Sequence, residues 1–165
     1  MSHPEIESSP ATPAADTARV LVFPPLLFAV TLALGLVLEW AFPIGRLPPL
    51  PARIAGGVLL LASGALARWS RVTLKRAGTN INPNKPTLAL VTGGPFGYSR
   101  NPLYAAALGL YLTGALLFDV TWPLVLFVPM VVVLQWGVIA REERYLSNKF
   151  GAAYDGYRSR VRRWL

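Results

Sequence analysis

The sequence contains no cysteine, one histidine (His3), and charged residues at only 15% of its 165 positions. The absence of cysteine excludes disulfides, thiolate metal sites and cysteine nucleophiles. Because the single histidine lies near the start of the chain, away from every other polar motif, nothing favours a metal site or a histidine general base. A soluble domain usually has about 25% charged residues, so the low charge argues against a soluble protein.

Hydrophobic residues make up 53% of the sequence, and most of them lie in long apolar runs. Residues 20–42 form a first run, which is long enough to cross about 30 Å of hydrocarbon at about 1.5 Å per residue. A second run covers residues 52–69, and two more, 103–118 and 120–140, are separated by little more than Asp119. Small residues recur along one face of two of these runs, which predicts close helix packing in lipid: Ala52, Gly56, Ser63 and Ala67, then Ala105, Gly109 and Thr113.

These runs predict an all-α fold, an integral membrane helical bundle of about four transmembrane helices. The run at 103–118 is short for a full crossing, so we expect neighbouring helices to bury it or the helix to continue past the lipid boundary. From Arg141 the chain turns polar, and Gly151 and Gly156 are candidate interruptions. Apolar residues at spacings of three and four predict a C-terminal amphipathic helix on the membrane surface: Leu146, Phe150, Ala153, Tyr157 and Val161.

Residues 1–18 are rich in proline, serine, alanine and threonine, a composition that predicts a disordered tail, and residues 19–165 form the membrane domain. The net charge of +8 is unevenly placed: six Lys/Arg lie between Arg68 and Arg100, and seven follow from Arg141 onward. The positive-inside rule therefore predicts four crossings with both termini, and the loop at 78–100, in the cytoplasm.

The excess of positive charge flanks the apolar runs, as it does beside anionic lipid headgroups, so membrane lipids are the expected partner. No nucleic-acid recognition motif accompanies it, and nucleic-acid binding is not expected. Arg160, Arg162 and Arg163 are interpreted as headgroup contacts of this kind.

Two polar clusters adjoin the last two apolar runs. Residues 94–104 read Gly-Pro-Phe-Gly-Tyr-Ser-Arg-Asn-Pro-Leu-Tyr, and residues 141–146 read Arg-Glu-Glu-Arg-Tyr-Leu. A helical hairpin would bring these clusters together, because it places the start of one helix beside the end of the other. A purely structural interpretation makes Asn101 and Pro102 a helix cap and a first helical residue, with the two glutamates solvated and paired to Arg141 or Arg144.

Residues 150–157, Phe-Gly-Ala-Ala-Tyr-Asp-Gly-Tyr, complete a pattern. With the two polar clusters, in this order and spacing, the chain resembles the isoprenylcysteine carboxyl methyltransferase family, within the wider group that includes phospholipid methyltransferases. The resemblance covers about residues 79–165, and it does not extend to the first two apolar runs. It implies S-adenosyl-L-methionine as methyl donor, a lipid-like or prenylated acceptor, and a cofactor pocket built from the last hairpin, its preceding loop and the C-terminal helix.

The resemblance also implies roles for particular residues. Glu142 or Glu143 would bind the cofactor ammonium by a charge-assisted hydrogen bond. Backbone N–H groups around Gly94, Gly97 and Pro102 would bind its carboxylate. The other residues expected at the cofactor are Pro95, Phe96, Arg100, Asn101, Tyr104 and Leu146.

Three residues of the C-terminal part are assigned to the acceptor: Tyr154, Tyr157 and Arg158. Of these, Arg158 would hold an acceptor carboxylate bidentately, through two parallel hydrogen bonds from its planar guanidinium. The expected catalytic residues are accordingly Glu142, Glu143 and Arg158.

Asn101 departs from the family pattern, which usually has histidine at this position. Asparagine donates hydrogen bonds but is no base at neutral pH, so we expect it to orient the cofactor. A carboxylate acceptor of the isoprenylcysteine type is then favoured, because an ionised carboxylate is already a nucleophile. A phospholipid or another small lipophilic acceptor stays open, as do an NADPH-binding membrane reductase, whose known relatives are much longer, and a non-catalytic membrane protein.

Overall fold

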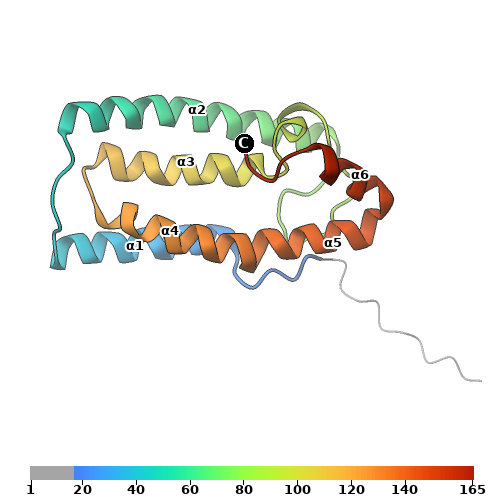
Figure 1. Cartoon of the computed structure of the whole chain (residues 1–165), viewed down its shortest axis with the longest axis horizontal. Helices are drawn as coiled ribbons and strands as arrows, with labels where there is room; N and C mark the ends of the chain where they lie inside the picture. Colours follow the sequence, from blue (N-terminus) through green and yellow to red (C-terminus); the bar gives the residue numbers. More distant parts are fainter. Residues whose placement is uncertain (1–16) are drawn as a thin grey trace, which may run out of the picture.

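The computed structural model describes residues 17–165, and this part of the chain is helical and contains no strand. The tail predicted over residues 1–18 lies outside the described residues, except for its last two. The elements, in order, are α1 (Pro24–Ala41), α2 (Pro49–Arg76), the 3-10 turn η1 (Gly94–Gly97), α3 (Pro102–Leu117), α4 (Trp122–Leu134), the π-helical turn η2 (Gln135–Ile139), α5 (Ala140–Phe150) and α6 (Ala152–Arg160). Helices α1 to α4 lie side by side, and α5 and α6 are at one end (Figure 1).

Three stretches are long and apolar enough to cross a membrane: α1, α2 and the continuous helix Trp122–Phe150. Helix α3 is shorter, with 16 residues, and its neighbours bury residues along its whole length. The predicted all-α membrane bundle is confirmed, and so is the expectation that neighbouring helices bury the short helix.

Small residues let α2 and α3 approach closely, which confirms the packing predicted from their spacing. A Cβ atom at Gly109 of α3 would collide with the side chain of Ser63 on α2. A Cβ at Gly56 of α2 would lie 2.8 Å from Cδ2 of Leu117 on α3. Such contacts replace the hydrophobic driving force that is missing between helices in lipid.

Helices α1 and α4 form a second pair, and α3 joins it to α2. Gly35 of α1 packs so tightly on Pro123 that a Cβ there would come 2.8 Å from Cγ of the proline. Tyr111 of α3 donates a hydrogen bond to the Pro123 carbonyl at 3.1 Å. A buried apolar cluster links these helices: Leu108, Tyr111, Met130, Leu134, Val138 and Ile139.

The last long helix contains the π-helical turn η2. The backbone N–H of Leu21, just before α1, donates to the Gly137 carbonyl within this turn at 2.9 Å. A π turn interrupts the regular ladder of a helix and is often found near functional sites. Here it docks the segment that precedes α1 onto the last helix.

The C-terminal part differs from the single surface helix that the sequence predicts. Residues 140–150 continue the membrane helix directly through η2. Gly151, with φ of 53°, ends that helix, and α6 then folds back toward the bundle (Figure 1). Gly156 lies inside α6 and does not interrupt it. The reversal at Gly151 is what brings the residues after α6 to the start of α3.

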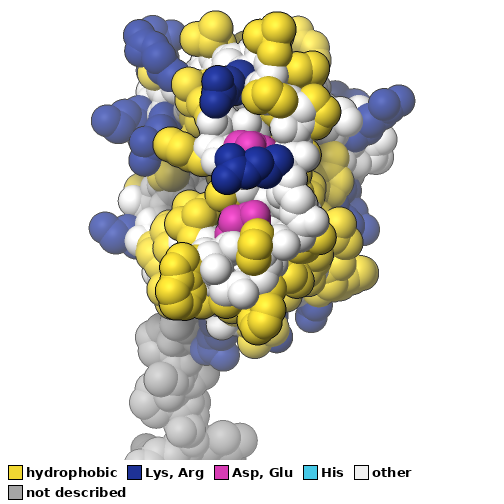
Figure 2. All heavy atoms as spheres, turned by 90° about the vertical axis from the view of Figure 1, so that its left-hand side faces the viewer, with side chains coloured by type: hydrophobic (Ala, Val, Ile, Leu, Met, Phe, Trp, Pro, Cys, Tyr) yellow, Lys and Arg dark blue, Asp and Glu magenta, His cyan; other side chains and the backbone are white. Residues whose placement is uncertain are grey.

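Side chains also connect the loops at the opposite end of the bundle. Glu39 accepts hydrogen bonds from the backbone N–H groups of Thr121, at 2.7 Å, and Trp122, at 2.9 Å. Asp119 accepts one from the N–H of Leu47 at 2.8 Å. Figure 2 views this end and shows acidic side chains on either side of a basic one; Arg46 lies 4.0 Å from Asp119.

Candidate active site

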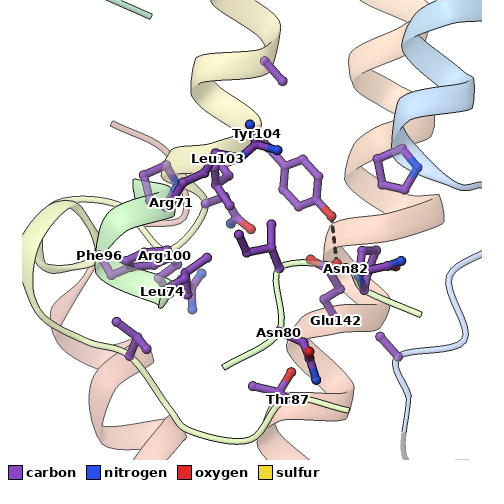
Figure 3. A pocket seen from close by; sticks show the side chains of 18 of the residues that line it. Arg71, Leu74, Asn80, Asn82, Thr87, Phe96, Arg100, Leu103, Tyr104 and Glu142 are labelled. Atoms are coloured by element: carbon purple, nitrogen blue, oxygen red, sulfur yellow. Dashed lines mark hydrogen bonds between the residues drawn. The ribbon is translucent and has the colours of Figure 1, made fainter. Parts of the chain in front are cut away.

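A cavity of about 880 Å³ opens where α1, α3 and α5 meet the loop that follows α2 (Figure 3). Its volume falls within the range of roughly 300–1,000 Å³ found for small-molecule sites. Ten of the residues expected at the site line it: Phe96, Arg100, Asn101, Pro102, Tyr104, Glu142, Glu143, Leu146, Tyr154 and Tyr157.

The start of α3 and the beginning of α5 meet in this cavity, as the hairpin prediction requires. The Tyr104 hydroxyl donates a hydrogen bond of 2.7 Å to Oε1 of Glu142 (Figure 3). This contact fixes the direction in which the Glu142 carboxylate points. Because both residues line the cavity, a carboxylate is held in position on its wall.

Glu143 lies next to it but is satisfied within the protein, and its side chain is only 9% exposed. Arg163 binds both of its oxygens, through Nε to Oε1 at 3.0 Å and through Nη2 to Oε2 at 2.6 Å. Nη2 of Arg100 approaches Oε1 at 3.1 Å. The glutamate therefore pairs with Arg100 and Arg163, and not with Arg141 or Arg144 as the structural interpretation assumed.

Arg100 has unused hydrogen-bonding capacity. Its side chain is 9% exposed, yet neither Nε nor Nη1 has an acceptor in the part of the chain that the structure describes. Burying an unpaired donor of a charged group is costly, so native sites normally supply a partner. Because Arg100 lines the cavity, an anionic group of a bound molecule can supply it.

Hydrogen bonds to backbone carbonyls attach the segment after α6, which contains Arg163, to the residues before α3. The Arg163 carbonyl accepts hydrogen bonds from Oγ of Ser99, at 3.2 Å, and Nδ2 of Asn101, at 3.0 Å. The carbonyl of Arg162 accepts one from the backbone N–H of Arg100 at 2.9 Å, and Trp164 packs on the buried apolar cluster. Hydrogen bonding to Glu143 raises the pKa of Arg163 above its usual value.

Two of the sequence interpretations are corrected by these contacts. Asn101 occupies the position before α3, but its side chain does not cap the helix; it is engaged by the Arg163 carbonyl. Pro102 does begin the helix, as predicted. The Arg163 guanidinium contacts Glu143 and is not left to lipid headgroups, because the reversal at Gly151 brings it inward.

Tyr154 and Tyr157 of α6 are buried at the edge of the cavity. Their rings meet edge-on with centroids 6.0 Å apart, and the Tyr157 hydroxyl donates to the Phe96 carbonyl at 2.7 Å. Burial raises the pKa of each to about 12. Both hydroxyls are therefore protonated donors at neutral pH.

Four of the expected residues do not line the cavity: Gly94, Pro95, Gly97 and Arg158. Gly94, with φ of 60°, packs on Trp69 and Thr73 of α2, so the Gly-Pro-Phe-Gly turn serves to place Arg100 and Asn101. Arg158 is exposed on α6.

Sequence reasoning expected the loop after α2 at the pocket, although it named no residue of that loop before Gly94, and it missed the contribution of α1 and α2. The residues of these three segments at the cavity include Phe28, Ala29, Leu32, Arg71, Leu74, Asn80, Asn82 and Thr87. Figure 3 shows Arg71 and Leu74 near Arg100, and Asn80 and Thr87 near Glu142. The apolar members look like lipid-facing residues in the sequence, and only the basic end of the second run and the long polar loop offered a signal.

Comparison with known proteins gives two matches. A family model described as phospholipid methyltransferase matches residues 51–153. An uncharacterized protein of Haemophilus influenzae is 51% identical over 35 residues, which cover 21% of this chain and 56% of that protein. The chain thus spans little more than half of that relative. No solved structure matches the chain.

Proposed function

Because the chain belongs to the phospholipid methyltransferase family, we propose that it transfers the methyl group of S-adenosylmethionine to a lipophilic acceptor bound in the cavity. Family membership favours this activity over a membrane reductase and over a non-catalytic role. The cavity adds a chemical reason that is independent of the family.

The observation that carries the proposal is that two opposite charges share one cavity. S-adenosylmethionine has an ammonium and a carboxylate on the same carbon, next to an apolar linker and a sulfonium. Glu142, oriented by Tyr104, suits the ammonium. The unpartnered Nε and Nη1 donors of Arg100 suit the carboxylate, since a guanidinium binds a carboxylate through two parallel hydrogen bonds.

Arg100 is proposed for this role because two of the positions that the sequence named for it, Gly94 and Gly97, do not line the cavity; the third, the start of α3 at Pro102, does line it. The ring of Tyr104 and neighbouring apolar residues of α3 are left to pack on the adenosine. When bound, the cofactor would supply a methyl group on a positively charged sulfur: an acceptor nucleophile would bond to the methyl carbon as the carbon–sulfur bond breaks, and S-adenosylhomocysteine would leave as a neutral thioether. The residues of this chain bind and orient the reactants and keep water away.

The acceptor side of the cavity has an apolar wall. Phe28, Ala29 and Leu32 of α1 face it together with Leu110 and Tyr111 of α3, all within the apolar part of the bundle. A hydrocarbon chain can lie against this wall while its polar end reaches the cofactor. We propose a carboxylate of the isoprenylcysteine type, which needs no general base. Because Arg158 does not reach the cavity, Arg71 on α2 is the better candidate to hold that carboxylate.

A phospholipid amine is the alternative acceptor, and the family description favours it. An ammonium headgroup must lose a proton before it can attack a methyl group. Glu142 is assigned to the cofactor ammonium and Glu143 is bound by Arg163, so this proton would pass to solvent before the amine attacks. The two acceptors therefore predict different pH dependence: the rate with a carboxylate acceptor stays level above about pH 5, whereas the rate with an amine rises with pH.

The decisive experiment supplies purified protein in lipid nanodiscs with methyl-labelled S-adenosylmethionine and one acceptor at a time. The acceptors are an S-prenylated cysteine with a free carboxylate and phosphatidylethanolamine. A base-labile methyl ester identifies the first, and a base-stable N-methyl product identifies the second. Absence of transfer to either acceptor, together with no binding of S-adenosylmethionine, would refute the proposal; binding of NADPH instead would favour the reductase.

We also propose that the cavity opens on the cytoplasmic side. The loop after α2 and the segment from α5 onward carry most of the basic residues, and both lie at the cavity end. Cysteines introduced at the exposed positions Arg158 and Arg46 should then differ in labelling by a membrane-impermeant reagent added to intact cells. Only the second should react, and the reverse pattern would contradict this orientation.

A further inference from the structure

Three charged side chains form a compact cluster beside the cavity: Arg100, Glu143 and Arg163. Both oxygens of the glutamate are bound by Arg163, which leaves Arg100 a single contact through Nη2. Two guanidinium groups thus share one carboxylate, and the cluster has a net positive charge. The side chains of Arg100 and Glu143 are each 9% exposed, and that of Arg163 is 36% exposed.

Arg100 and Glu143 form the buried part of this cluster, and a buried guanidinium with unpaired donors calls for an anionic partner. The excess positive charge of the cluster is located on Arg100, because Nε and Nη1 lack an acceptor among the described residues. A guanidinium with a carboxylate to itself normally binds it through two donors on one edge of its fork. Arg100 instead makes one contact with Glu143, whose two oxygens both accept hydrogen bonds from Arg163.

We propose that Arg163 is a positioning residue of the site: by occupying Glu143, it keeps two donors of Arg100, a residue of the cavity lining, unpaired for the carboxylate of S-adenosylmethionine. This inference rests on the proposed function. Without Arg163, the Arg100 fork would turn to Glu143 and close a two-bond pair. The donors meant for the ligand would then be used inside the protein.

The architecture after α6 supports this role. Asn101 and Ser99, which flank Arg100, both donate to the Arg163 carbonyl. The N–H of Arg100 itself donates to the neighbouring Arg162 carbonyl. The segment after α6 is therefore attached to residues 99–101, and these include Arg100, whose side chain it is proposed to position. It lies beyond residues 51–153, the part of the chain that the family model matches.

The role of Asn101 follows from this arrangement. Its side-chain amide holds the backbone of Arg163, so it acts on the ligand through Arg163 and Glu143. This contact requires only an N–H donor, which the asparagine amide supplies.

The test compares S-adenosylmethionine with its decarboxylated analogue, by calorimetric titration of the purified protein. Arg163→Gln should weaken binding of S-adenosylmethionine at least tenfold, to about the affinity of the analogue, and leave binding of the analogue unchanged. Arg163→Lys, which keeps the charge but lacks the fork, should lie between wild type and Arg163→Gln. Arg162→Gln, at the exposed neighbouring position, is the matched control and should bind like wild type.

A double variant separates positioning from general damage to the fold. In Arg163→Gln combined with Glu143→Gln, no carboxylate remains to capture Arg100, so affinity for S-adenosylmethionine should recover at least threefold relative to Arg163→Gln alone. A merely structural role predicts an equal or larger loss, and for both ligands. Either that result or unchanged binding by Arg163→Gln would overturn the inference, and the proposed function would stand as long as wild type binds S-adenosylmethionine. If wild type does not bind it, both are overturned.

Discussion

The two ends of the helical bundle each hold a pair of acidic residues, and the pairs are used differently. At one end, Glu39 and Asp119 accept backbone N–H groups of the adjoining loop and turn. At the other end, Glu143 is bound by two arginines, and Glu142 is oriented by a tyrosine on the wall of a cavity. Glu39 and Asp119 thus bind groups of the protein itself, whereas Glu142 and Arg100 line a cavity that can hold a ligand. The surroundings of an acidic residue, and not its type, decide between stability and binding.

The largest effect on ligand affinity is expected from replacing an arginine at the cavity end of the bundle, compared with replacing one at the opposite end. Arg100→Gln removes two buried charged donors, each worth about 1.5–3 kcal/mol, so binding of S-adenosylmethionine should weaken more than about 100-fold. Glu143 keeps Arg163 as its partner, so the fold should persist. Calorimetric titration measures the loss, and Arg46→Gln at the opposite end is the control, expected to bind like wild type. Equal affinity of Arg100→Gln and wild type would remove Arg100 from the site.

Next in size is Glu142→Gln, which removes one charge from the cavity wall. The amide can still accept from Tyr104, so the geometry should remain while the attraction for an ammonium is lost. We expect a loss of roughly 10- to 100-fold in affinity for S-adenosylmethionine, from about 1.5–3 kcal/mol. Asp155→Asn, on exposed α6, is the matched acid-to-amide control. If both variants bind equally well, Glu142 does not contact the ammonium.

Glu39→Ala should change stability and leave binding intact. The variant leaves the N–H groups of Thr121 and Trp122, at the start of α4, without their side-chain acceptor. Loss of such a cap costs about 0.5–2 kcal/mol, so the midpoint of thermal unfolding in detergent should fall by several degrees. Affinity per folded molecule should match wild type; a loss of affinity as large as that of Glu142→Gln would mean that the two ends are not independent.

The smallest effect is expected from Asp119→Asn. Its amide oxygen can still accept from the N–H of Leu47, and asparagine tolerates the left-handed φ of 55° found here. Only the charge opposite the exposed Arg46, 4.0 Å away, is lost, and exposed ion pairs contribute little. Thermal unfolding should therefore be within about 0.5 kcal/mol of wild type. A drop comparable to that of Glu39→Ala would show that the charge itself stabilises this end.

Much of the fold could be predicted because it depends on local pattern. Apolar run length specified the helices, and the spacing of Gly56, Ser63 and Gly109 specified the face on which α2 and α3 pack. The hairpin placed Tyr104 near Glu142 across an interval that no local motif spans. These features follow from helix geometry and from the need to bury small residues together.

What could not be predicted depends on chain reversals and on interruptions within helices. The direction of the chain after Gly151 decides whether Arg163 faces lipid or Glu143, and no periodicity encodes that direction. The π turn likewise left no mark in the apolar pattern of residues 120–140, although it docks the segment before α1. Helix α1 is apolar around most of its circumference. The sequence therefore does not distinguish the α1 residues that face the cavity from those that face lipid.

The most direct test titrates S-adenosylmethionine into wild type, Glu142→Gln and Glu39→Ala under identical conditions, with unfolding midpoints measured on the same samples. We predict that wild type binds, that Glu142→Gln loses affinity at least tenfold with little change in midpoint, and that Glu39→Ala, which removes the acceptor of two N–H groups, binds normally with a lowered midpoint. Failure of wild type to bind, or equal losses of affinity in both variants, would contradict the assignment of the cavity end as the methyl-donor site.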